Sequence, residues 1–252
     1  MRVTVVGSGT VVPTLERRQS CVAVEAGGEL LLFDVGSGAV RGLLRAGLDP
    51  LEVDRVFLTH FHPDHTVDLV ALLFSVRYGS ETPRTRPLRL YGPEPFAGFW
   101  ESLKGVWGEW ISGDYLEVTE LPRTGDAGLE LPGGALFWGP VLHRPESIGY
   151  RLEGDRGPLV YTGDTAYGQP VISLARGAHT LLAECSFPDE TPVEGHLTPS
   201  GVAAIAAEAG VRRLVLTHLY PQVDTPELPE KVRAAGFGGE VVVARDGLAF
   251  EV

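Results

Sequence analysis

Short apolar runs recur along this chain, separated by glycine, proline and charged residues. Runs of this length, rich in valine and leucine, are typical of buried β-strands. Between some of them, apolar positions instead recur with the period of an α-helix. The pattern predicts strands at residues 3–6, 22–24, 30–33, 56–58, 88–91, 159–161, 181–183, 214–216 and 241–243, and helices at residues 39–45 and 202–209. Because strands are mixed with helices, we expect an α/β architecture.

The chain has 252 residues, which is long enough to bury a substantial core. Two segments have the composition of linkers, namely the Pro/Arg-rich residues 82–87 and the Gly-rich residues 125–134. We expect both to be loops inside a single domain that spans residues 1–252.

One internal similarity connects the two ends of the chain. Residues 53–63 can be laid over residues 211–221 with Val, Arg, Leu, Thr, His and Pro agreeing at matching places. Chance similarity of two buried strands is one interpretation. The other, which we favour, is two related halves that deliver His60 and His218 from the C-terminal ends of strands. Crevices at such strand ends are where open α/β sheets bind their ligands.

Composition and charge argue against several classes of function. The formal charge of −12 would repel long polyanions, which argues against non-specific DNA binding. No apolar run approaches the roughly 18 residues needed to span a bilayer, and the first residues do not resemble a signal peptide. We therefore expect a cytoplasmic protein without a membrane partner. Cys21 and Cys185 lie far apart, which predicts two buried free thiols.

Residues 58–68 read Leu-Thr-His-Phe-His-Pro-Asp-His-Thr-Val-Asp and hold three of the seven histidines. In an extended segment His60 and His62 point the same way and can reach one ion. Pro63 suits the first turn of a helix, in which Asp64 and His65 splay away from them. One short loop can therefore serve two metal centres. Imidazole and carboxylate ligands suit Zn²⁺, with Mn²⁺ and Fe²⁺ as alternatives.

The loop needs further ligands from elsewhere in the chain. Three more histidines, His143, His196 and His218, lie where an apolar strand gives way to a loop, and Asp164 follows a strand and a glycine. A single strand-end His or Asp is more often a cap or turn residue. Together with the dense loop, however, these residues predict a dinuclear metal site with Asp164 as the bridging carboxylate. His179 lacks such a context, and we interpret it as structural.

The His60–His65 motif resembles that of the metallo-β-lactamase superfamily. Other motifs resemble its ribonuclease Z and phosphodiesterase branch, and they lie at residues 5–10, 32–36, 143–151, 161–165, 183–187, 196–198 and 216–218. The resemblance runs nearly end to end. It implies a four-layer αβ/βα sandwich with the metals at one edge, and a homodimer.

The resemblance also implies a role for each site residue. His60, His62 and His143 would hold one divalent cation, Asp64, His65 and His218 the other, and Asp164 would bridge them together with a water that attacks the substrate. Asp64 could accept a proton from that water. His196 would be the general acid that protonates the leaving group, and Glu184 would orient it. The alternatives are an exposed strand-end acid for Glu184 and a helix-start residue for His196. Asp34 would support the metal loop without binding a metal.

Two departures from ribonuclease Z matter. His143 and Asp164 are only 21 positions apart, which leaves no room for the arm that grips tRNA. The Ser-Arg pair usual after the last ligand is also missing after His218. Both features are closer to compact, arm-less phosphodiesterases of cyclic nucleotides or cyclic phosphates.

Two further groups of residues have a less specific pattern. Arginines downstream of the metal loop could grip a phosphate, but solvated loop residues are the favoured interpretation (Arg77, Arg84, Arg86 and Arg89). Aromatic residues at helical spacing are interpreted as core or interface rather than a base-stacking platform (Phe99, Trp100, Trp107 and Trp110).

The leading hypothesis is a metal-dependent phosphodiesterase acting on a small or cyclic nucleotide, another phosphate ester or an RNA 3′ end. A ribonuclease Z-type tRNA 3′ endonuclease is the first alternative. Thioester or lactam hydrolysis ranks lower, because it does not need the pair of Glu184 and His196. A diiron oxidoreductase ranks lower still, since redox members of the superfamily carry Glu at the position of His62. A degenerate binding module is least favoured, because no expected ligand is missing.

Overall fold

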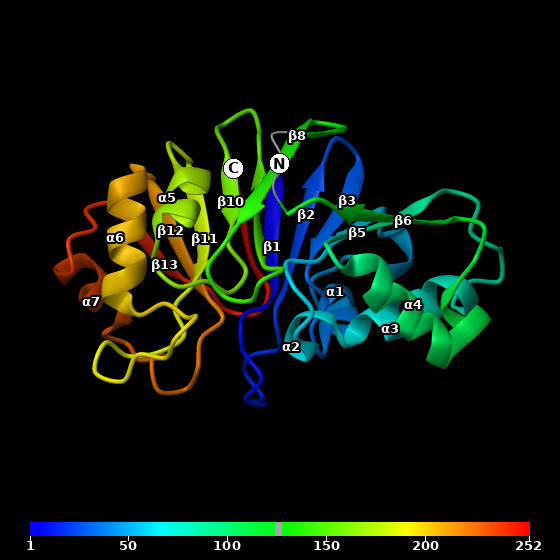
Figure 1. Ribbon diagram of the computed structural model, residues 1–252, viewed down its shortest axis with the longest axis horizontal. Coiled ribbons are helices and arrows are strands. Elements are labelled where there is room, and N and C mark those ends of the chain that lie inside the picture. Colours follow the sequence, from blue (N-terminus) through cyan, green and yellow to red (C-terminus); the bar gives the residue numbers. More distant parts are fainter. Residues whose placement is uncertain (124–127) are drawn as a thin grey trace.

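The computed structural model describes residues 1–123 and 128–252 and contains two seven-stranded sheets packed face to face (Figure 1). The first sheet has the strand order β14 (Leu248–Glu251), β1 (Arg2–Gly7), β2 (Cys21–Ala26), β3 (Glu29–Phe33), β4 (Arg55–Phe57), β5 (Leu88–Pro93) and β6 (Leu116–Leu121). The second has the order β13 (Glu240–Val243), β12 (Arg213–Thr217), β11 (Thr180–Glu184), β10 (Leu159–Tyr161), β9 (Ile148–Leu152), β8 (Gly134–Pro140) and β7 (Leu129–Leu131).

The two sheets have the same internal plan. In the first, β3, β4, β5 and β6 are parallel and the remaining neighbours are antiparallel. In the second, β10, β11, β12 and β13 are parallel, and the remaining neighbours are antiparallel. The similar stretches of the sequence form β4 and β12, which occupy different sheets. The structure thus has the two related halves that the sequence predicts.

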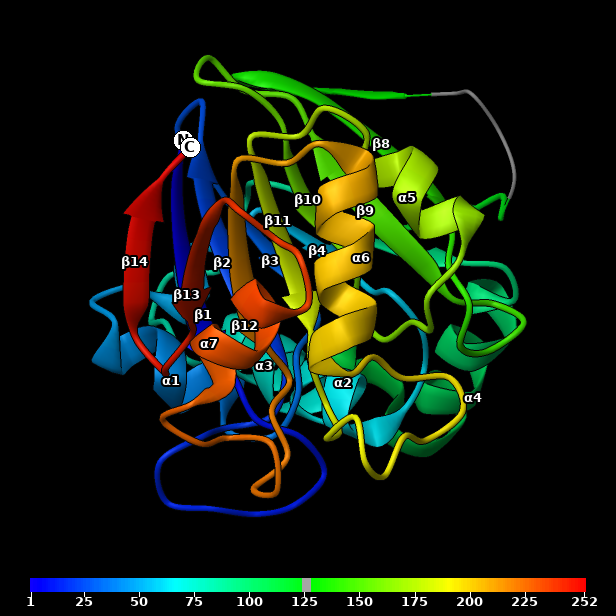
Figure 2. The ribbon, with the colours of Figure 1, turned by 90° about the vertical axis from the view of Figure 1, so that its left-hand side faces the viewer.

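Helices cover the outer face of each sheet (Figures 1 and 2). Those on the first sheet are α1 (Ala39–Arg45), α2 (Pro63–Thr66), α3 (Asp68–Tyr78) and α4 (Phe96–Trp107), with the short turns η1 (Pro50–Glu52) and η2 (Gly108–Ile111). Those on the second are α5 (Gln169–Ala175), α6 (Pro199–Ala209) and α7 (Leu228–Ala234). Apolar residues fill the three spaces between the layers. The predicted four-layer αβ/βα sandwich is confirmed.

Each strand predicted from an apolar run is present, and the helix predicted at residues 39–45 is α1. Residues 82–87 form the expected loop between α3 and β5. Residues 125–127 lie outside the described part of the chain. The loop predicted at residues 125–134 is wrong beyond them, because Leu129 and Leu131 alternate with Glu130 and form β7, which pairs with β8 through a turn at Gly133.

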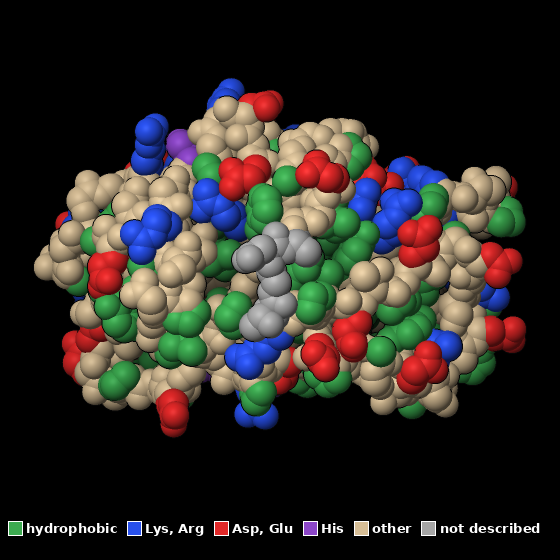
Figure 3. All heavy atoms as spheres, turned by 45° about the horizontal axis from the view of Figure 1, so that its top comes forward, with side chains coloured by type: hydrophobic (Ala, Val, Ile, Leu, Met, Phe, Trp, Pro, Cys, Tyr) green, Lys and Arg blue, Asp and Glu red, His purple; other side chains and the backbone are tan. Residues whose placement is uncertain are grey.

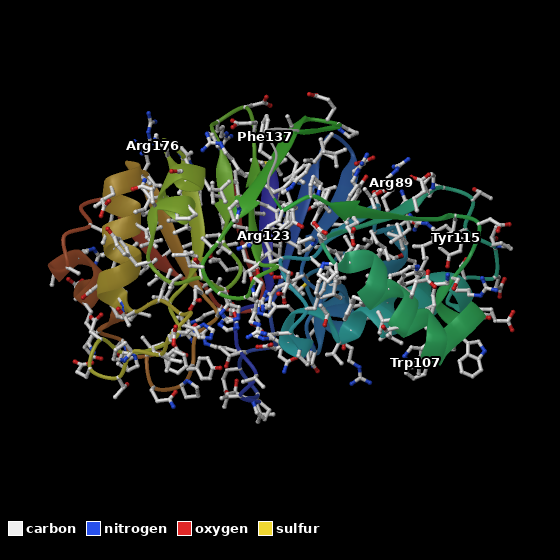
Figure 4. The ribbon with its side chains drawn as sticks, in the orientation of Figure 1. Arg89, Trp107, Tyr115, Arg123, Phe137 and Arg176 are labelled. Atoms are coloured by element: carbon white, nitrogen blue, oxygen red, sulfur yellow. The ribbon has the colours of Figure 1, made fainter. Side chains whose placement is uncertain are left out.

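Several smaller predictions can be compared directly with the structure. Cys21 and Cys185 are buried and free. Trp100 belongs to the core, whereas Trp107 and Trp110 are exposed. Figure 4 shows Trp107 at the outer edge of α4. Both exposed tryptophans line a hollow of about 760 Å³, which Phe61 of the metal loop also borders. Among the described residues, no helix has the length and apolar content needed to cross a lipid bilayer.

Candidate metal centre

The metal loop, residues 60–65, begins just after the C-terminal end of β4. His62 has extended backbone angles, φ −60° and ψ 145°, and Pro63 begins the single turn of α2. Asp64 and His65 lie within that turn and are buried. The predicted change from extended chain to helix is therefore present. Because of it, the side chains of His60 and His62 lie in a different position from those of Asp64 and His65.

His62, His143 and His60 converge on one side of Asp164. The Nε2 atom of His143 lies 3.2 Å from Nδ1 of His62. Oδ2 of Asp164 lies 3.8 Å from Nε2 of His143 and 3.9 Å from Nε2 of His60. Ligands bound at about 2.1 Å to a tetrahedral zinc ion stand about 3.4 Å apart. The spacing of these four side chains therefore fits one divalent cation.

Asp64, His65 and His218 converge on the other oxygen of Asp164. Oδ1 of Asp164 lies 3.3 Å from Nε2 of His65 and 3.5 Å from Nε2 of His218. Oδ2 of Asp64 lies 3.4 Å from Nε2 of His218. Asp164 thus presents one oxygen to each cluster, which is the arrangement expected of a bridging ligand.

Unpartnered atoms and uncompensated charge both fit metal ions at these positions. Four buried polar atoms that face the two clusters have no hydrogen-bond partner in the described part of the chain: Nε2 of His60, His65 and His218, and Oδ1 of Asp164. Four carboxylates are also buried here, and no arginine or lysine among the described residues forms an ion pair with any of them (Asp34, Asp64, Asp164 and Glu184). Buried charge of this kind needs a counter-charge, and two divalent cations would supply it.

The other ring nitrogen of each buried histidine is fixed by a hydrogen bond. Nδ1 of His65 contacts Oδ2 of Asp34 at 2.7 Å, and Nδ1 of His143 contacts the carbonyl oxygen of Gly195 at 3.0 Å. Carboxylates and carbonyls only accept, so these Nδ1 atoms carry the hydrogen and leave Nε2 free to bind a metal. Nδ1 of His218 contacts the Ser186 hydroxyl at 3.0 Å in a similar way.

Asp34 supports the metal loop as expected and does not join either cluster. Its carboxylate accepts hydrogen bonds from the Thr59 amide at 2.8 Å and the Tyr161 hydroxyl at 2.8 Å, besides its contact with His65. It also has a left-handed backbone with φ 59°. Sequence reasoning missed Thr59, although Thr precedes His218 as well as His60 in the repeated segment. Nothing in the sequence indicates Tyr161.

The pKa shifts within the site follow burial and the carboxylates. Burial lowers the pKa values of His60, His62 and His143, so these rings favour the neutral form that binds metals. Burial also opposes the charged form of His65, but Asp164 and Asp34 outweigh it and raise its pKa. The carboxylates of Asp164 and Asp34 therefore favour the positively charged form of the His65 ring.

Glu184 and His196 form a pair beside the clusters. Glu184 is fully buried at the end of β11, and its Oε1 lies 3.0 Å from Nδ1 of His196. The interpretation of Glu184 as an exposed acid is therefore excluded. Burial lowers the pKa of His196, but the hydrogen bond and charge of Glu184 outweigh it and raise the pKa above its ordinary value. Because Nδ1 donates to the carboxylate, Nε2 is the ring nitrogen that takes no part in this bond.

His196 also approaches the metal clusters. Its Nδ1 lies 4.0 Å from Oδ2 of Asp164, and His196 could join Asp164 and His218 as a third group of ligands. The hydrogen bond to Glu184 occupies Nδ1, so ligation through this atom would break that bond. Phe187 packs edge-on against His196 and stacks on Tyr220, so an aromatic pair borders this side of the site.

The remaining candidates are structural. His179 contacts Thr180 and belongs to neither cluster. The four arginines hold local structure instead of lining the site: Arg77 donates to the Ser112 carbonyl, Arg84 to the Leu51 and Val53 carbonyls, Arg86 pairs with Asp54, and Arg89 pairs with Glu117. Arg89 lies at the upper right of Figure 4, well away from α2 at the lower centre of Figure 1.

The αβ/βα sandwich and the His/Asp clusters at the ends of its strands define a metallohydrolase. Residues 31–219 match the family model described as the beta-lactamase superfamily domain, and the chain belongs to this superfamily.

Three known proteins illustrate the relationship. A ribonuclease Z from Myxococcus xanthus is 32% identical, with 100% of this chain and 98% of the relative covered. The metallo-beta-lactamase fold protein YhfI from Bacillus subtilis is 25% identical, with a TM-score of 0.86 over 100% of this chain and 99% of that one. A diphosphatase from the PhnP family is also 25% identical, with a TM-score of 0.74 over 100% and 97% of the two chains.

Proposed function

We propose that this protein is a phosphodiesterase that uses two divalent cations, most readily Zn²⁺, to hydrolyse a small or cyclic phosphodiester or an RNA 3′ end. The observation that carries the proposal is the hydrogen-bonded pair of buried Glu184 and half-buried His196 beside the two ligand clusters. A phosphodiester releases an alkoxide, which needs a proton, whereas a thioester releases a thiolate, which leaves without one. The pair therefore favours phosphodiester hydrolysis over thioester hydrolysis.

The residues would divide the work as follows. His60, His62 and His143 would hold one cation and Asp64, His65 and His218 the other, with Asp164 contributing to both sites. Such cations would lower the pKa of a bound water and offset negative charge on the phosphate. Asp64 accepts a proton from the attacking water. His196 donates a proton from Nε2 to the leaving oxygen, and Glu184 holds the ring and favours its charged form.

The short connections around the site support a compact substrate. The chain passes from β9 to β10 through residues 153–158 alone, so no arm extends between His143 and Asp164. Figure 3 turns the top of Figure 1 toward the viewer and so shows a side of the molecule away from α2, on which acidic and basic side chains are interspersed. The short connection between β9 and β10 therefore favours a small molecule or a chain end over extended contact with RNA.

Cleavage of tRNA precursors is the second candidate, and it is supported by the relatives named ribonuclease Z. The alignment with the Myxococcus protein nevertheless spans 309 residues, whereas this chain has 252, so that relative carries segments that are absent here. Full coverage of this chain indicates that the shared part includes the catalytic core.

One assay separates the candidates. Protein loaded with Zn²⁺ or Mn²⁺ is compared on bis-p-nitrophenyl phosphate, 2′,3′-cyclic nucleotides, a 3′-extended tRNA precursor and a thioester. We expect the phosphodiesters to be hydrolysed. Turnover of the thioester alone would refute the proposal, and efficient cleavage of the tRNA precursor alone would assign the second function.

A further inference from the structure

The metal site lies across the seam between the two sheets. His60, His62 and His65 follow β4 of the first sheet, whereas Asp164 and His218 follow β10 and β12 of the second. Their separation therefore depends on the contacts that fix one sheet against the other near this end. A network of hydrogen bonds around Arg17 makes such contacts.

Arg17 lies in the loop between β1 and β2, and its side chain is only 6% exposed. Nε and Nη2 donate to the two carboxylate oxygens of Asp224, each at 2.8 Å. Nη1 donates to the Ser8 hydroxyl at 2.7 Å and to the Ala244 carbonyl at 2.6 Å. Ser8 follows β1 of the first sheet and Ala244 follows β13 of the second. One guanidinium thus ties both sheets to the loop that follows His218.

Asp246 reinforces the same network from the other side of Ser8. Its Oδ1 accepts from the Ser8 amide at 2.9 Å and from the Ser8 hydroxyl at 2.8 Å, and its Oδ2 accepts from the Arg18 amide at 2.7 Å. Ser8 is therefore held by two charged groups, so its backbone offers a rigid point of attachment.

His218 needs such an attachment, because its backbone is left-handed with φ 52°, a conformation that non-glycine residues rarely adopt. The amide of Leu219, the next residue, donates to the Ser8 carbonyl at 3.1 Å. On the other side, Nδ1 of the His218 ring contacts the Ser186 hydroxyl at 3.0 Å. Bonds on either side of His218 thus hold it in place, and one of them leads through Ser8 to Arg17.

We propose that Arg17 is a positioning residue for His218, acting through Ser8 and Asp224. Arg17 would thereby set the cation affinity of the cluster formed by Asp64, His65 and His218. None of its hydrogen bonds reaches the other cluster, so that cluster should not depend on it. The inference rests on the proposed metal centre and is independent of the substrate.

The test compares Arg17→Lys and Asp224→Asn with a matched control, Arg55→Lys. Lysine keeps the charge of Arg17 but cannot form the two parallel bonds. Arg55 is also buried and also pairs through two bonds with a carboxylate, that of Glu29 at 2.6 and 3.0 Å, but it stands at the start of β4, away from the site. For the full chain, Zn²⁺ affinities are measured by calorimetric titration against a competing chelator, and thermal unfolding of the metal-free protein is measured alongside.

We expect Arg55→Lys to bind two zinc ions with the same two affinities as the wild type. Arg17→Lys and Asp224→Asn should lower the affinity for the ion in the cluster of Asp64, His65 and His218 by about 10–100-fold, as loss of a supporting residue does in other metal sites. The affinity for the other ion should stay unchanged. Asp224 is one-third exposed, so we expect Asp224→Asn to fold. This variant can therefore test the inference even if Arg17→Lys does not fold.

Four results would overturn the inference: wild type binding fewer than two ions, unchanged affinities in both variants, equal weakening of the two ions, or the same pattern in Arg55→Lys at an equal loss of thermal stability. A failure of the phosphodiester assay with intact two-ion binding would instead contradict only the proposed function.

Discussion

Replacement of His196 by alanine separates proton donation from every other role of this residue. Among the residues that the structure describes, the imidazole is hydrogen-bonded to Glu184 alone. After its removal, Glu184 still accepts from the Thr165 amide at 2.7 Å, the Leu197 amide at 3.1 Å and the Ser186 hydroxyl. The buried carboxylate therefore stays partnered, and we expect the fold to tolerate the change.

The expected loss is specific to the leaving group. Positioned general acids contribute roughly 10²–10⁴-fold, which corresponds to about 3–5 kcal/mol of the activation barrier. His196→Ala should show this loss in kcat on 2′,3′-cyclic nucleotides, whose leaving alkoxide needs a proton. It should nearly spare bis-p-nitrophenyl phosphate, whose leaving group departs without one. His179→Ala, which removes a histidine remote from both clusters, serves as the control.

One further measurement accompanies the kinetics. Zinc content is determined by mass spectrometry, because His196 could otherwise be a metal ligand with Asp164 and His218. Stoichiometry should equal that of the wild type. Equal kinetic losses on the two substrates, or loss of one zinc ion, would remove His196 from the acid role.

Three further predictions follow from the site and the core. Chelation should lower the melting temperature by several degrees, since a ligand that binds only the folded state at 1,000 times its Kd stabilises it by about 4 kcal/mol; an unchanged calorimetric transition would contradict metal binding. Tyr161→Phe removes a buried donor to Asp34 and should cost about 1–3 kcal/mol in urea unfolding, whereas an unchanged midpoint would show that this bond contributes nothing. Burial raises the pKa values of Cys21 and Cys185, so Ellman's reagent should react with neither thiol until the protein unfolds; rapid reaction of the folded protein would contradict their placement.

The elements that the sequence predicts are those with a local signal. The metal loop is predictable because four ligands lie within six residues, and the buried parallel strands are predictable because they are continuous apolar runs. Strand β8, with the sequence Gly-Ala-Leu-Phe-Trp-Gly-Pro, has glycine and proline at its ends and no clean alternation, so it was missed. Strand β7 has only three residues and lies in a glycine-rich stretch that is typical of a loop, so the sequence does not indicate it either.

Contacts between distant residues have no such local signal. Tyr161 meets Asp34 across 127 positions, and Arg17 meets Asp224 across 207. The complete burial of Glu184, which distinguishes it from an ordinary surface acid, also depends on tertiary packing. The sequence therefore indicates the side chains that gather in the two clusters, but not the residues that hold them in place.

The metal loop has a second face. Between His60 and His62, which belong to one candidate metal cluster, Phe61 stacks on Phe99 of α4 at a centroid distance of 4.8 Å. The same Phe61 borders the hollow that Trp107 and Trp110 line. Phe61 therefore links the loop to the surroundings of two indoles, so we expect intrinsic fluorescence to report any change of loop conformation when a divalent cation is added.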